Sequence, residues 1–109
     1  MKINRTTAVL YNDPGLVVRM LPALERAAGA GQVREMPPRL AADDFAAFSA
    51  AAPGFYWFLD ASPHTDRMGA PNHSPLFAVD EKYLKTGVKA AVSVVLHYMQ
   101  AAGDGQAAR

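Results

Sequence analysis

Three histidines are the residues of this 109-residue chain whose type and setting best suit a reactive site. His73 stands in the segment PNHSPLF, between Pro71 and Pro75, which restrict the backbone on either side of it. Neutral imidazole is a good zinc ligand, and zinc sites need ligands that are held in few orientations. The segment allows two interpretations, an ordinary loop histidine or a metal ligand.

The other two histidines have weaker settings. His64 lies in the same loop, within ASPHTDRM, where polar residues surround it and no proline follows it directly. His97 falls on the side of a predicted helix opposite the apolar stripe of that helix, which is typical of a solvated side chain. His73 is therefore the candidate metal ligand among the three.

Two pairs of neighbouring acids, Asp43 with Asp44 and Asp80 with Glu81, open predicted helices. Paired carboxylates can bind metal or transfer protons, but neighbours on a helix point about 100° apart. We expect one acid of each pair to cap its helix and the other to lie in solvent. No glycine spacing suits a phosphate, and no catalytic residue is assigned within the chain.

Short apolar segments alternate along the chain with helical patterns. Strands are predicted at TTAVLY (6–11), QVREM (32–36) and FYWFL (55–59). The continuous apolar run of FYWFL is typical of a strand that is buried on both faces of a parallel sheet. The alternation predicts an α/β fold with a small, mostly parallel sheet of about three strands and three helices. Such a sheet is near the lower size limit, so it resembles part of a larger one.

Local signals mark the helices. Asp13 can cap a helix that starts at Pro14 and ends before Gly29, and Pro22 inside it should cause a kink. A second helix lies within 41–54. The last helix starts from Asp80 and runs to about Ala102, ahead of a frayed tail at 103–109. One stripe of this last helix is apolar: Leu84, Val88, Ala91, Val92, Val95 and Met99.

The composition excludes several classes of protein. The net charge is +1, from 11 basic and 10 acidic residues that form no basic stripe, which argues against nucleic acid or an anionic membrane as a partner. The chain has no cysteine, so neither a disulfide nor a thiolate metal site can form. We read no signal peptide and no membrane span, and we expect one cytoplasmic α/β unit over residues 1–109.

Taken together, the segments MPPRLAADDFAAF, PGFYWFLDA and NHSPLFAVDEKYLKTGVKAAVSVVLHYM resemble the C-terminal segment of the zinc-dependent amidohydrolase and metallopeptidase family. That family includes hippurate hydrolases, N-acyl-amino-acid amidohydrolases, aminoacylases and related carboxypeptidases. The resemblance runs from about Asn12 to Met99. It implies that the chain is the C-terminal part of a larger three-layer catalytic domain.

The resemblance also implies roles for single residues. The histidine of the family's His-Ser-Pro-x-Phe motif is a metal ligand, and His73 is the matching position. Asp43 and Asp44 match an acidic pair near the substrate, so we expect them to bind substrate together with Asn72. Zinc or another divalent metal is implied in the complete enzyme and none in the isolated chain, because the family's other metal ligands and its glutamate base precede this segment.

Some positions depart from the family. Ala41 and Asp60 stand where the family has glycines, so a close backbone approach is not expected at either place. Asp43 itself replaces the glutamate of the family's pattern.

Two main hypotheses follow. In the first, the chain is part of a metal-dependent amidohydrolase that cleaves the amide bond of N-acyl amino acids or small peptides, and it is inactive alone. Its partners would be a missing N-terminal half or a second copy of the chain. In the second, it is a truncated, non-catalytic α/β module for binding or dimerisation. An unrelated α/β domain that binds a small ligand is a third alternative.

Overall fold

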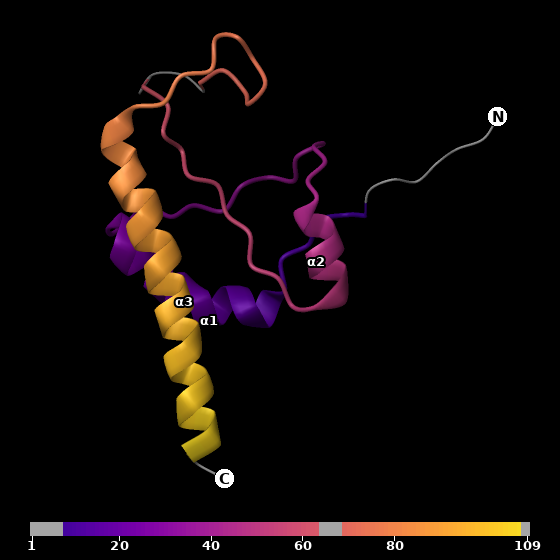
Figure 1. The fold of residues 1–109 in the computed structure, drawn as a ribbon, viewed down its shortest axis with the longest axis vertical. Coiled ribbons are helices and arrows are strands. Elements are labelled where there is room, and N and C mark those ends of the chain that lie inside the picture. The colour runs from indigo at the N-terminus through magenta and orange to yellow at the C-terminus, as the bar shows by residue number, and fades with distance from the viewer. Residues whose placement is uncertain (1–7, 64–68, 108–109) are drawn as a thin grey trace, which may run out of the picture. The chain divides into compact units, whose positions relative to one another are not determined.

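A computed structural model describes residues 8–63 and 69–107, which contain three α-helices and one short 3₁₀-helix (Figure 1). The α-helices are α1 (Pro14–Ala28), α2 (Phe45–Ala51) and α3 (Leu84–Ala107), and the 3₁₀-helix η1 (Glu81–Tyr83) directly precedes α3. The chain divides into two compact units, Met1–Trp57 and Phe58–Arg109. The single unit expected over residues 1–109 stays a prediction.

No β-strand is present in the described residues, so the predicted α/β fold with a mostly parallel sheet is wrong. Segments 8–11, 32–36 and 55–59 have no regular secondary structure, and residues 6–7 lie outside the described part. An apolar, β-branched segment becomes a strand only where another strand pairs with its backbone groups. None of the five FYWFL side chains is buried, and Phe58 is 53% exposed.

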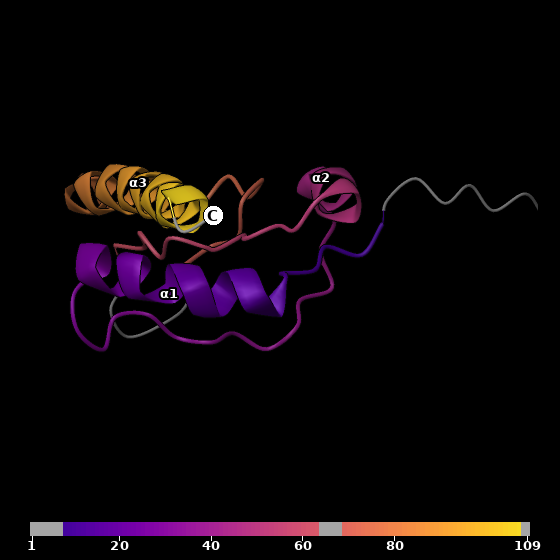
Figure 2. The same ribbon diagram turned by 90° about the horizontal axis from the view of Figure 1, so that it is seen from below.

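Helix α1 begins and ends at the residues that the sequence indicated. The Asp13 carboxylate accepts a hydrogen bond of 2.7 Å from the Leu16 N–H, and Pro14 is the first helical residue. Gly29 ends the helix with a φ of 103°, which only glycine adopts readily. The buried residues of α1 are Met20, Ala23, Leu24 and Ala27. A long segment without regular structure connects α1 to α2 (Figure 2).

Helix α2 is short, and its first residue is capped by the acid two residues before it. Oδ1 of Asp43 accepts a hydrogen bond from the Phe45 N–H at 2.8 Å. Asp44 is exposed and makes no side-chain capping bond. The prediction that one acid of this pair caps the helix while the other lies in solvent is therefore confirmed.

The start of α1 and the segment after α2 are joined by the side chain of Asn12. Its amide donates to the Tyr56 carbonyl at 2.8 Å and accepts from the Tyr56 N–H at 2.7 Å. The Asp13 N–H donates to the Gly54 carbonyl at 2.9 Å. A side-chain amide takes the place of a backbone peptide group here, so the pairing does not continue as a β-ladder.

Gly54 allows the segment after α2 to lie close against that helix, within the same unit. A Cβ atom at this position would lie 3.0 Å from Cβ of Ser49 and 3.1 Å from Cε1 of Phe45. A larger residue would therefore require these neighbouring side chains to shift, whereas glycine allows the close approach.

In the second unit, Asp80 fixes the start of η1 and the end of the preceding loop. Its carboxylate accepts from the Lys82 N–H at 3.1 Å, and its own N–H donates to the Ala61 carbonyl at 2.8 Å. The latter bond closes the loop that contains His73. Helix α3 then continues to Ala107, beyond the end expected near Ala102.

The apolar stripe of α3 is exposed. Val88 and Met99 are 66% and 63% exposed, whereas Ala90 and Val94, on the opposite side of the helix, are buried. His97, which was expected in solvent, is half-buried. Helix α3 is thus apolar on both sides, which is typical of a helix enclosed within a larger protein. We call the exposed side the outer face of α3: Leu84, Val88, Val92, Val95, Leu96 and Met99.

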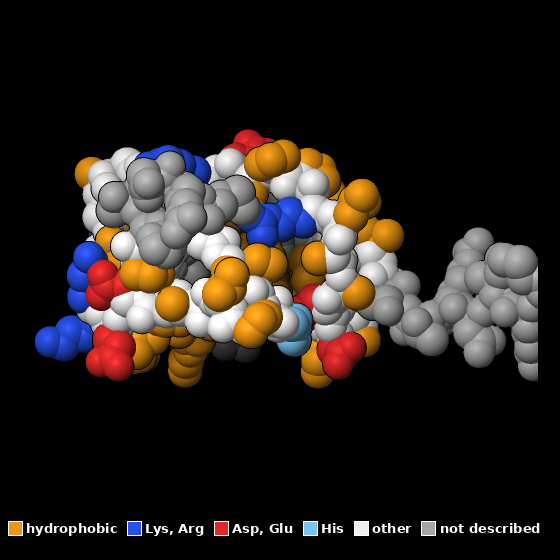
Figure 3. All heavy atoms as spheres, turned by 90° about the horizontal axis from the view of Figure 1, so that it is seen from above, with side chains coloured by type: hydrophobic (Ala, Val, Ile, Leu, Met, Phe, Trp, Pro, Cys, Tyr) orange, Lys and Arg blue, Asp and Glu red, His pale blue; other side chains and the backbone are white. Residues whose placement is uncertain are grey.

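The buried core of the described residues is small. It has seven hydrophobic residues, four of which are alanine, while eighteen large hydrophobic residues are exposed. Hydrophobic side chains are correspondingly visible over the face drawn in Figure 3. Within the described residues, no helix combines the length and the hydropathy that crossing a membrane requires.

Replacing Asn12 with alanine should destabilise the first unit. Two hydrogen bonds to Tyr56 are lost, and we expect the free energy of unfolding to fall by about 1–2 kcal/mol. Urea denaturation followed by circular dichroism measures the change. Asp44→Ala, at an exposed residue, is the control and should change stability by less than about 0.5 kcal/mol. Equal stabilities of the two variants would contradict the bridging role of Asn12.

Candidate functional site

His73 occupies a strained backbone position in a tight turn. Its φ is 71°, and no other non-glycine residue among those described has a positive φ. The Ser74 N–H donates to the Pro71 carbonyl at 3.1 Å, so Asn72 and His73 are the central residues of a four-residue turn. A positive φ at the second central residue is typical of a type II turn, which favours glycine or asparagine there. The left-handed conformation costs about 1–2 kcal/mol for other residues.

A second turn follows directly and also involves Ser74. The Phe77 N–H donates to the Ser74 carbonyl at 3.0 Å, and the Leu76 N–H donates to Ser74 Oγ at 3.1 Å. Pro75 is the first central residue of this turn, where its fixed φ is favourable. The backbone is therefore held on both sides of His73. The histidine itself is exposed, so its imidazole is accessible to a ligand.

The loop that carries His73 ends at an exposed ion pair. Lys82 Nζ lies 2.6 Å from Oδ2 of Asp80 and 4.8 Å from the centre of the Tyr83 ring. The hydrogen bond to Lys82 lowers the pKa of Asp80, and the same bond raises the pKa of Lys82. Because both groups are in contact with solvent, the pair orients the start of η1 more than it stabilises the unit.

The described residues bring no three histidine or acidic side chains close enough together to hold a metal ion. His64 lies outside the described residues. Catalytic zinc usually has three protein ligands, so His73 can be only one member of such a set. Its role as a metal ligand stays a prediction.

The two acids Asp43 and Asp44 have different environments. Both carboxylate oxygens of Asp43 have partners: Oδ1 caps α2, and Oδ2 accepts a 3.0 Å hydrogen bond from the Tyr56 hydroxyl. The rings of Phe45 and Tyr56 are 5.3 Å apart. The bond to Asp43 raises the pKa of Tyr56, because ionising the phenol would lose a donor beside a negative charge.

The structure thus places the predicted residues in two groups. Asn72 and His73 share one turn, and Asp43 and Asp44 share the start of α2. The roles of Asp43, Asp44 and Asn72 in substrate binding stay predictions. Tyr56, the partner of Asp43, was missed because no local pattern links a carboxylate to a phenol thirteen residues later in the chain.

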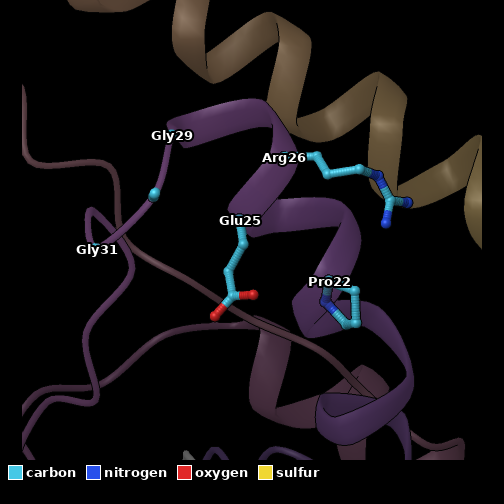
Figure 4. Close-up of a pocket in the computed structure, with 6 residues that line it drawn as sticks. Pro22, Glu25, Arg26, Gly29 and Gly31 are labelled. Carbon is cyan, nitrogen blue, oxygen red and sulfur yellow. The ribbon is translucent and has the colours of Figure 1, made fainter.

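A shallow, open depression lies at the C-terminal end of α1. It contains none of the predicted site residues. Figure 4 shows the Glu25 and Arg26 side chains extending in different directions rather than converging on a ligand. The residues that line it are Pro22, Glu25, Arg26, Gly29, Ala30 and Gly31.

Sequence comparison relates the chain to peptidases and amidohydrolases. It is 32% identical over 90 residues to Thermostable carboxypeptidase 2 of Saccharolobus solfataricus, a match that covers 83% of this chain and 22% of that protein. It is 45% identical over 58 residues to Thermostable carboxypeptidase 1 of the same organism, covering 53% of this chain and 15% of that protein. It is also 25% identical over 91 residues to the Putative amidohydrolase YhaA of Bacillus subtilis, covering 84% of this chain and 23% of that protein.

The matches cover a small part of each of these proteins. The chain spans between 15% and 23% of the length of these curated relatives. No family model and no solved structure matches it. The class supported by the matches is therefore a hydrolase-related segment similar to part of carboxypeptidases and amidohydrolases.

Glycine should be tolerated better than alanine at His73. We expect His73→Gly to be more stable than His73→Ala by about 1 kcal/mol, since the φ of 71° is unstrained only for glycine. Urea denaturation of both variants measures the difference. At Asn72, whose φ is not positive, alanine should be at least as stable as glycine. If glycine gave no advantage at position 73, the strained turn would be absent in solution.

Tyr56 should ionise above the usual tyrosine pKa of about 10. Folding raises the pKa of Tyr56, so the bond to Asp43 stabilises the fold fully at a pH below the pKa of Tyr56 in the unfolded chain. This stabilisation is lost as the pH rises through the pKa of Tyr56 in the folded protein. The absorbance difference at 295 nm between the wild type and Tyr56→Phe isolates this titration. Asp43→Asn should lower the pH at the midpoint of the Tyr56 titration, and Asp44→Asn should leave that midpoint unchanged. An unchanged midpoint in Asp43→Asn would refute the contact.

Proposed function

We propose that this chain is the C-terminal part of a metal-dependent amidohydrolase or peptidase and that His73 is one of its metal ligands. The observation that carries the proposal is the turn at His73, where the hydrogen bonds of two consecutive turns fix the strained backbone that bears an exposed imidazole. A residue kept in a costly conformation often marks a functional position. The similarity to two carboxypeptidases and an amidohydrolase supports the same class.

The imidazole of His73 is a suitable ligand for zinc or a similar divalent ion. A metal of this kind supplies Lewis acidity for amide hydrolysis when it is bound. His73 would hold it through a neutral imidazole nitrogen. Asn72 lies beside it in the turn, with an exposed side chain that can donate to and accept from an amide substrate. Asp44 offers an exposed carboxylate, whereas Asp43 is used to position α2 and Tyr56.

The substrate would be a small molecule, an N-acyl amino acid or a short peptide. The remaining metal ligands and the general base would come from an N-terminal half outside these 109 residues, as the extent of the matches suggests. The large exposed hydrophobic surface supports this view, because an excess of uncovered apolar side chains marks an interaction surface. The isolated chain would not catalyse hydrolysis.

A second candidate function is a non-catalytic binding or dimerisation module. The observation that favours it is the outer face of α3, six apolar residues that are exposed along one side of a single helix. This function needs no metal and no role for His73.

Zinc should bind His73 weakly in the isolated chain and support no turnover. In a Zn²⁺ titration followed by NMR, we expect the His73 ring signals to shift and those of His97 to stay in place, because His97 is half-buried. His73→Ala should remove the response, while His97→Ala should leave it intact. Hydrolysis of an N-acyl amino acid should stay at background. Stoichiometric zinc with turnover, or zinc binding without a His73 shift, would contradict the proposal.

A further inference from the structure

Ser74 is the residue that the two turns beside His73 share. Its N–H donates to the Pro71 carbonyl at 3.1 Å and closes the first turn, and its carbonyl accepts from the Phe77 N–H at 3.0 Å and closes the second. Ser74 is half-buried, whereas the other residues of 71–79 are exposed. The backbone on the C-terminal side of His73 is therefore held through this one residue.

The hydroxyl of Ser74 makes a third hydrogen bond, which the backbone of this residue does not supply. Its Oγ accepts from the Leu76 N–H at 3.1 Å. Serine is favoured at the first position of a turn, because its hydroxyl can bind the backbone of the residue two positions later. Pro75 restricts the backbone of Ser74 to extended conformations. The hydroxyl and the proline together fix the direction of the Ser74 N–H that closes the turn of His73.

The left-handed backbone of His73 needs such a constraint. A histidine with a φ of 71° relaxes to a negative φ unless the surrounding structure opposes the change. The free-energy cost of the left-handed conformation is similar to the net contribution of one hydrogen bond, so a single bond can decide which conformation prevails. The backbone conformation of His73 in turn sets the direction in which its Cβ atom, and with it the imidazole, leaves the turn.

We propose that Ser74 is a positioning residue for the metal ligand His73 and that it acts through its hydroxyl, an inference that rests on the proposed function. Groups that orient a metal ligand without touching the metal are a general part of metal sites. The Ser74 hydroxyl is bound by the Leu76 N–H and acts on His73 through the backbone, so it is not a ligand itself. Removing it should change the backbone of His73 and leave the imidazole able to bind zinc.

NMR of the 109-residue chain tests the effect on the backbone. At a φ near 71° the amide and α protons of a residue are nearly eclipsed, so His73 should show a strong nuclear Overhauser effect (NOE) between them. Ser74→Ala should reduce this NOE to about half or less, and Ser74→Thr, which keeps a hydroxyl, should restore it. Ser49→Ala is the matched control and should leave it unchanged, because that hydroxyl binds the Ala46 carbonyl in α2. A weak NOE in the wild type, or an undiminished one in Ser74→Ala, would overturn the proposal.

A Zn²⁺ titration of the same variants separates positioning from metal binding. The zinc concentration at the midpoint of the His73 ring shift should agree within about twofold between the wild type and Ser74→Ala, because a single imidazole that binds zinc alone needs no fixed direction. A larger rise of the midpoint in Ser74→Ala would make the hydroxyl a ligand and overturn the positioning role. The absence of a His73 shift in the wild type would refute the proposed function and the metal role inferred here, whereas an undiminished NOE would refute this inference alone.

Discussion

The constraint on which this structure depends is that the chain has more apolar surface than its own fold covers. Its few buried residues are mostly alanines, which remove little area from water, and Met20 is the largest fully buried side chain. Helix α3 shows the consequence most clearly, since Ala90 and Val94 are buried while the outer face is not. Hydrophobic burial within either unit is therefore small, and the uncovered apolar residues favour association.

Side-chain hydrogen bonds connect the segments within each of the two units. Asn12 binds both backbone groups of Tyr56, Asp43 caps α2, and Asp80 caps η1 while its own N–H closes the loop onto Ala61. Each of these contacts gives a partner to backbone groups that would otherwise be unpaired. The result is a set of helices joined by segments without regular structure.

The turn at His73 connects this local construction to chemistry. Pro71 and Ser74 supply the carbonyl and the N–H that close the turn, and Ser74 then caps the next one. The histidine gains nothing in stability from its left-handed backbone, because glycine or asparagine would fit there at lower cost. That cost is understandable if the imidazole has a ligand to hold, which is how the proposed metal role and the similarity to hydrolases fit together.

The sequence by itself determined that three helices form and where α1 begins and ends. Asp13, Pro14 and Gly29 act within one turn of their own helix, and the capping acid before α2 was likewise readable, because such signals are local. The tertiary structure decided that the described residues form no sheet, that Asn12 bridges to Tyr56 and that the α3 stripe is exposed. Strand pairing and burial depend on which distant residues come together, and no pattern within a short segment contains that information.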